Sequence, residues 1–197
     1  MRAIRMVDNL QEDGVQVLGY VPTNVDWKMA PNATQHKELW ATLVELMKEM
    51  RDPRTLPALM EALDWRAEVS ENHAISAADT LRYMEVPGDK KGEVVRALCA
   101  GLEKVTGPRP IDNRLRNGFI KGLGAMGDNS ATECLIRVAT NQSEEQNFLF
   151  NRLAAQQLGV LADPAAVPAL IKGLFLFAPN NPGMRMNDVA GEALVRI

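Results

Sequence analysis

The feature that most constrains this chain is a pattern that recurs along it. Its clearest copy spans 151–174, where Asp163-Pro164 separates two apolar stretches. Fainter copies follow one another at intervals of about 34 to 42 residues, the range of two-helix repeat units. Because two sets of anchor residues keep the same order, the chain is predicted to be an array of helix pairs. The first-helix anchors are Met47, Leu81, Leu123, Leu158 and Leu194, and the second-helix anchors are Leu59, Leu98, Leu135 and Leu170.

Each copy places its apolar residues on one side of a helix. In the copy at 149–175, Val167, Leu170, Ile171 and Leu174 fall at positions i, i+3, i+4 and i+7, which form one stripe on an α-helix. One helix pair cannot bury such a stripe alone, so successive copies must stack to cover it. The sequence therefore predicts an all-α fold.

An aspartate stands between the two helices in three of the copies. The pairs are Asp52-Pro53, Asp128-Asn129 and Asp163-Pro164. An Asp side chain can accept hydrogen bonds from the exposed amides of the coming helix, and a following Pro has a fixed φ and no amide to leave unpaired. Each pair therefore predicts the start of a second helix.

Residues 152–174 resemble the HEAT-like repeat that was first grouped with phycobilisome lyases. The resemblance rests on an Arg- and Ala-rich first helix, Leu158-Gly159, Asp163-Pro164, and the Val-Pro-Ala-Leu run at 167–170. The copy at 149–175 matches closely, and those at 38–64 and 114–140 match moderately. The copy at 72–104 matches only with about five inserted residues around 87–92. The resemblance implies a right-handed α-α superhelix, the HEAT-like α-solenoid.

The repeats divide the chain into two parts. Residues 38–197 are expected to form the array, with about four helix pairs and the first helix of a fifth at 188–197. Residues 1–37 do not match the repeat and are unassigned, although an alternating run of apolar residues there is compatible with a short extended piece. Because the last copy supplies a first helix only, we expect a fragment of a longer bacterial repeat array.

The two cysteines, Cys99 and Cys134, fall on the second helices of adjacent copies. Counted from the anchors Leu98 and Leu135, they stand two positions out of register, so their side chains are expected to point to different faces. A disulfide needs Cα atoms within about 7 Å and side chains that face each other. We therefore predict two small buried residues and no disulfide.

Charge is spread unevenly along a mildly acidic chain, whose formal net charge is -3. The stretch 90–121 holds eight Lys and Arg residues against three acidic residues, and its flanks are acidic. Such a patch can attract an acidic protein segment or a phosphate backbone. The simpler interpretation is that these are solvated charges on helix faces and loops.

No pattern indicates catalysis, a metal or a cofactor. Residues 122–127 match G-x-G-x-x-G, but a dinucleotide fingerprint must follow a strand and open a helix. Here the glycines close a helix that begins near Arg114. The two histidines, His36 and His73, do not have metal-ligand spacing with other candidate ligands. We expect a protein that is not an enzyme and holds no cofactor.

The candidate site is a surface. In HEAT-like arrays the second helices line the concave side, so the resemblance implies a ridge two residues after each second-helix anchor. Repeat-built concave surfaces are the usual binding faces of such arrays. The ridge residues are Glu61, Ala100, Arg137 and Lys172, and Arg96, Lys104 and Glu133 flank them.

These observations favour a non-catalytic protein-interaction scaffold, whose partner is another protein or another domain of its own parent chain. Two alternatives stay open. One is a nucleic-acid-binding HEAT-like module that uses the stretch 90–121, although the mixed signs of the ridge disfavour a nucleic-acid partner. The other is an accessory module of a chromophore-lyase-type enzyme, which only the name of the repeat suggests.

The sequence also bounds other partners and the compartment. No apolar run is long enough to span a membrane, and no small-molecule substrate is predicted. Long bacterial HEAT-like proteins occur in the cytoplasm and in the envelope, so the resemblance leaves the compartment open.

Overall fold

A computed structural model describes residues 46–49, 51–64, 71–141, 148–178 and 181–197. The lead-in 1–37 and His36 lie outside the described residues. The chain divides into two compact units, residues 1–87 and 88–197, which we call the N-terminal and C-terminal units. The described residues are mainly helical, and the prediction of an all-α fold is confirmed, whereas the right-handed superhelical path stays a prediction.

The N-terminal unit contains helical residues at 46–49, followed by a short 3-10 turn η1 (Pro53–Thr55), α4 (Leu56–Leu63) and α5 (Glu71–Tyr83). Helix α4 packs against α5. The predicted anchors Met47, Leu59 and Leu81 are fully buried. Lys48 forms an ion pair with Asp79 of α5 at 3.4 Å, so the residues at 46–49 also contact α5.

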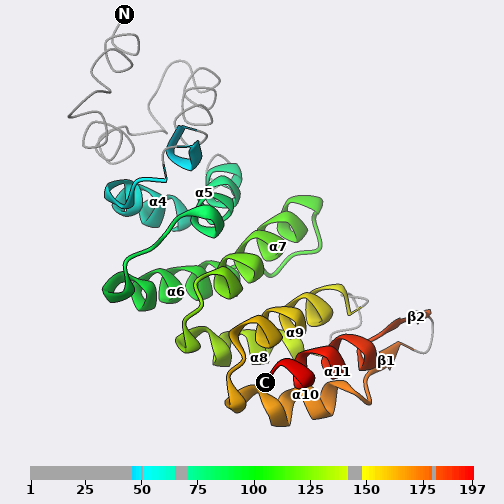
Figure 1. Cartoon of the computed structure of the whole chain (residues 1–197). Helices are drawn as coiled ribbons and strands as arrows, with labels where there is room; N and C mark the ends of the chain where they lie inside the picture. The colour runs from blue at the N-terminus through cyan, green and yellow to red at the C-terminus, as the bar shows by residue number, and fades with distance from the viewer. Residues whose placement is uncertain (1–45, 50, 65–70, 142–147, 179–180) are drawn as a thin grey trace, which may run out of the picture. The chain divides into compact units, whose positions relative to one another are not determined.

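The C-terminal unit holds most of the predicted array. Its helices are α6 (Gly88–Glu103), α7 (Pro110–Ala125), α8 (Thr132–Ala139), α9 (Leu149–Leu161), α10 (Val167–Gly173) and α11 (Asn187–Arg196). The first helices of successive copies, α7, α9 and α11, pack one on the next, while α8 and α10 pack against α9 and α11 (Figure 1). Helix α6 packs against α7. This alternation is the two-layer stacking that the repeat predicts.

The anchors of this unit lie where the register requires. Leu98, Leu123, Leu135 and Leu158 are fully buried, and Leu170 is 1% exposed. Leu194 of α11 is only partly buried. Close approach of the first helices depends on a glycine, because a Cβ added at Gly159 of α9 would lie 2.8 Å from the Cα of Ala193 in α11.

The predicted helix starts are confirmed, with one added detail. Each of the three aspartates caps a 3-10 turn that runs directly into a second helix: η1 before α4, η2 (Asn129–Ala131) before α8 and η4 (Pro164–Ala166) before α10. The side chains of Asp52, Asp128 and Asp163 accept from the amides of Arg54, Ser130 and Ala165 at 2.9, 2.8 and 3.0 Å. These bonds satisfy amides that the turn leaves exposed.

A β-hairpin interrupts the helical order between α10 and α11, which the sequence did not predict. Strand β1 (Phe177–Ala178) pairs antiparallel with β2 (Asn181–Arg185), and Phe177 lies opposite Arg185. Both α10 and α11 keep their positions in the repeat order. The hairpin is therefore an insertion between two copies.

Candidate functional site

The six predicted surface residues are all exposed. Arg96 lies on α6, Lys104 directly follows it, and Lys172 lies on α10, while Glu133 and Arg137 lie on α8. Glu61 lies on α4, in the N-terminal unit. The five residues of the C-terminal unit therefore lie on, or directly after, the second helices α6, α8 and α10. The concavity of this surface stays a prediction.

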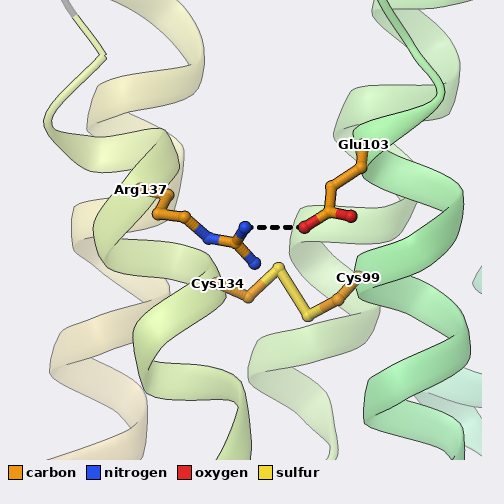
Figure 2. Close-up of a disulfide and its surroundings, with 4 residues drawn as sticks. All are labelled: Cys99, Glu103, Cys134 and Arg137. Atoms are coloured by element: carbon orange, nitrogen blue, oxygen red, sulfur yellow. Dashed lines mark ion pairs between the residues drawn. A yellow bond between two sulfur atoms is a disulfide. The ribbon is translucent and has the colours of Figure 1, made fainter.

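The prediction of two unlinked cysteines is wrong. Cys99 of α6 and Cys134 of α8 form a disulfide, with a Cα–Cα distance of 6.2 Å (Figure 2). Cys134 is 5% exposed, and Cys99 is partly buried. The bridge joins the second helices of two adjacent copies.

The error came from reading an offset of two positions as a difference of face. Cys99 follows the buried Leu98 by one residue, and Cys134 precedes the buried Leu135 by one residue. One residue of α-helix is a rotation of about 100°, so the two side chains turn in opposite senses from the core direction. On neighbouring helices that run the same way, these are the two sides that face each other.

An ion pair lies one helical turn beyond the disulfide. Arg137 of α8 donates its guanidinium Nη1 to Oε1 of Glu103 in α6 at 2.7 Å (Figure 2). Both side chains are 57% exposed, so the pair contributes only about 0.2 to 1 kcal/mol to stability. The disulfide and the ion pair connect α6 and α8 in the same order along both helices. These two helices are therefore parallel neighbours.

A pocket of about 280 Å³ lies beside these two links. Its polar lining comes from the ends of α6 and α8, from α7 and from the residue Asn141. Most of the remaining lining is apolar. The polar residues are Glu103, Arg116, Arg137 and Asn141, and the others are Leu102, Val105, Ile120, Cys134, Val138 and Phe150.

Arg116 of α7 forms one wall of this pocket. Its guanidinium carbon lies 5.6 Å from the centre of the Phe150 ring, and its Nη2 donates to the carbonyl oxygen of Val105 at 3.1 Å. The ring contact and the hydrogen bond both hold the guanidinium at this wall of the pocket. Among the described lining residues, Arg116 and Arg137 stand against one carboxylate, that of Glu103, so the described lining carries one excess positive charge.

Several cations of the basic stretch 90–121 have partners of their own. Lys90 pairs with Glu93 at 3.4 Å, and Arg109 pairs with Asp112 at 2.9 Å. The hydrogen bonds from Arg109 lower the pKa of Asp112, which also accepts from the backbone amide of Arg109 at 3.0 Å. Part of the positive charge is thus used in local pairs at the starts of α6 and α7.

The glycine motif has a structural role. Gly122 and Gly124 lie within α7, and Gly127, with a φ of +58°, comes just after its end. A Cβ at Gly124 would collide with the side chain of Gln157 in α9. The rejection of a dinucleotide fingerprint is therefore supported by the placement of all three glycines. His73 is buried on α5, and no group of potential metal ligands occurs among the described residues.

With this geometry in view, one comparison identifies the class of repeat. The family model of the PBS lyase HEAT-like repeat matches residues 152–175, which span most of α9, the turn η4 and α10. This segment is therefore a HEAT-like repeat, as its sequence indicates. A search of curated proteins gives no match to the chain. The described residues contain no helix with the length and apolar character needed to cross a membrane.

Proposed function

We propose that this protein is a non-catalytic scaffold that binds another protein, or another domain of its parent chain, through its layer of second helices. HEAT repeats commonly mediate protein interactions. The observation that carries the proposal is the exposed face of α6, α8 and α10. Each of these helices has a buried leucine anchor, and together they expose charged side chains of both signs. Arg96, Glu133, Arg137 and Lys172 are exposed there, while Leu98, Leu135 and Leu170 beneath them are buried.

Mixed charges on a rigid layer suit a protein partner better than a phosphate backbone. Charged groups at an interface select the partner by complementary potential. A nucleic acid instead needs a continuous positive surface, because its affinity comes from neutralised phosphates. On this face Glu133 and Glu103 interrupt the positive charges of Arg96 and Arg137.

The test reverses the charge of the second-helix layer. The double variant Arg137→Glu/Lys172→Glu should abolish capture of any specific protein partner that the wild-type chain retains in a pull-down. The matched control is Arg114→Glu/Arg196→Glu, which makes the same charge change at exposed positions on α7 and α11. Equal loss of capture in both double variants would contradict the proposal.

Specific nucleic-acid binding is the result that would replace the scaffold proposal. If the stretch 90–121 binds duplex DNA or RNA, affinity should fall linearly in log salt and drop in Lys90→Glu/Lys91→Glu. The scaffold proposal expects nucleic-acid affinity no tighter than the nonspecific range, about 10⁻⁴ M at physiological salt. Sub-micromolar binding with a steep salt dependence would overturn it.

A further inference from the structure

The disulfide borders a pocket whose described lining holds excess positive charge. Cys134 lines the pocket, together with the two arginines, Arg116 and Arg137. Figure 2 shows the guanidinium of Arg137 beside the bridge, one turn along α8. A small molecule in the pocket would therefore lie next to the sulfur of Cys134 and within the field of two cations.

The size and charge of the pocket define the reagent that it would accept. A volume of about 280 Å³ lies just below the usual range for small-molecule pockets, so only a small molecule fits. Disulfides are cleaved by thiolates, which are anions. The two arginines would attract a thiolate, and more strongly one that also carries a carboxylate.

We infer that this pocket is a thiol–disulfide exchange site for small anionic thiols, in which Cys99–Cys134 is the exchanging disulfide. The thiolate attacks the sulfur of Cys134, a mixed disulfide forms, and the Cys99 thiolate leaves. A second thiolate of the same kind then attacks the mixed disulfide at the small-molecule sulfur. The two small thiols become one disulfide, and the protein gains two electrons and, after protonation, two thiols. This exchange does not depend on the proposed scaffold function.

Arg137 and Glu103 provide a pair of opposite charge tests. Both line the pocket, both are equally exposed, and each is the other's partner at 2.7 Å. Arg137→Gln and Glu103→Gln break the same ion pair but change the pocket charge in opposite directions. If the broken ion pair acts by loosening the structure, the preference for the anionic thiol should change in the same direction in both variants. If it acts through charge, the preference should change in opposite directions.

The experiment measures how fast the native 197-residue chain is reduced by three thiols of different charge. These are 3-mercaptopropionate, which is anionic, 2-mercaptoethanol, which is neutral, and cysteamine, which is cationic. Each rate is divided by that of the same thiol, at equal thiolate concentration, with 2-hydroxyethyl disulfide free in solution. This ratio removes differences in intrinsic nucleophilicity.

We expect the ratio to be highest for the anionic thiol and lowest for the cationic one, by about two- to five-fold per unit charge. The preference should shrink at high salt. It should grow in Glu103→Gln, fall in Arg137→Gln and stay unchanged in Arg114→Gln, which alters an exposed residue outside the pocket lining.

Three results would overturn the inference. One is an equal ratio for all three thiols. Another is a shift in the same direction in Arg137→Gln and Glu103→Gln. The last is reduction that proceeds only at the rate of global unfolding, measured in parallel with a denaturant series, because the bridge would then be closed to reagents in the native state.

Discussion

Two junctions between neighbouring second helices are held in different ways. Between α6 and α8 the links are the Cys99–Cys134 disulfide and the exposed ion pair of Glu103 with Arg137. Between α8 and α10 the hydroxyl of Thr132 donates to the carboxylate of Asp163 at 2.7 Å. We call these the stapled junction and the hydrogen-bonded junction.

The kind of link at each junction correlates with how closely the copy there matches the HEAT-like repeat. Helix α10 belongs to the copy at 149–175, where the cap residue Asp163 serves both its own helix and the preceding one. The adjacent first helices are linked there as well, since Arg152 of α9 pairs with Asp188 of α11 at 2.9 Å. Helix α6 belongs to the divergent copy with inserted residues. In the regular copy, a residue of the repeat pattern itself, Asp163, forms the contact to the preceding second helix. In the divergent copy, a disulfide links the second helix to the next one.

The largest expected effect concerns two buried anchors of the copy at 149–175, Leu158 of α9 and Leu170 of α10. Leu158→Ala and Leu170→Ala should each lower the free energy of unfolding by about 2 to 5 kcal/mol, because both side chains are buried and their removal leaves a cavity. Val160→Ala and Ile171→Ala are matched controls on the same helices, 55% and 47% exposed. Denaturant midpoints should show a much smaller loss in the controls. A loss below about 1 kcal/mol at both leucines would mean that the repeat register is wrong.

Removal of the Cys99–Cys134 disulfide should have the next largest effect on stability. The bridge closes a loop with a sequence separation of 35 residues. Removing a disulfide that closes a loop of this length lowers the free energy of unfolding of a protein by about 2 to 4 kcal/mol. We expect Cys99→Ala/Cys134→Ala to show this loss in urea denaturation. Reductant should destabilise the wild-type chain and leave the double variant unchanged. Equal sensitivity of the two proteins to reductant would contradict the assignment.

Removing the hydrogen bond of the second junction should have a smaller effect on stability, and this effect should depend on pH. The Thr132 hydroxyl and the Ala165 amide hold the pKa of Asp163 below its ordinary value of 3.8. A carboxyl with a lowered folded pKa stabilises the fold above its unfolded pKa, and this contribution is lost as pH falls through the folded pKa. We expect Thr132→Val to lower the urea midpoint near neutral pH, because the hydrogen bond to Asp163 is lost, and this loss should shrink as pH falls below 3.8.

A second threonine, Thr140 at the C-terminal cap of α8, serves as the control for this substitution. Thr140 donates to the backbone carbonyl of Ile136 at 2.8 Å, an acceptor that does not titrate. The cost of Thr140→Val, measured from urea midpoints over the same pH series, should therefore stay constant. A cost of Thr132→Val that is equally independent of pH would show that its bond to Asp163 is absent in solution.

The features that the sequence predicts best are those set by local chemistry. The anchors follow from helical periodicity, and the helix starts follow from the hydrogen-bonding capacity of Asp52, Asp128 and Asp163. The hairpin between α10 and α11 was missed, although Pro182 and Gly183 both disfavour helix. Local patterns failed there because no repeat position corresponds to the insertion.

The candidate site was predicted only in part, because it depends on how helices face one another. The exposure of Arg137 follows from its position two residues after Leu135. Its pairing with Glu103, and the pocket beside them, need the placement of α6, α7, α8 and the start of α9, which no single helix encodes. The disulfide did leave a signal, since cysteines just after one anchor and just before the next lie on facing sides of parallel helices.

The stapled junction is tested most directly by peptide mapping of the 197-residue chain, purified without reductant and alkylated before digestion. Trypsin should place Cys99 in the peptide 97–104 and Cys134 in the peptide 122–137. The account predicts that these two peptides are recovered as one disulfide-linked species, which separates on reduction. Recovery of both peptides as separate alkylated species, with free thiols in the native chain, would contradict it.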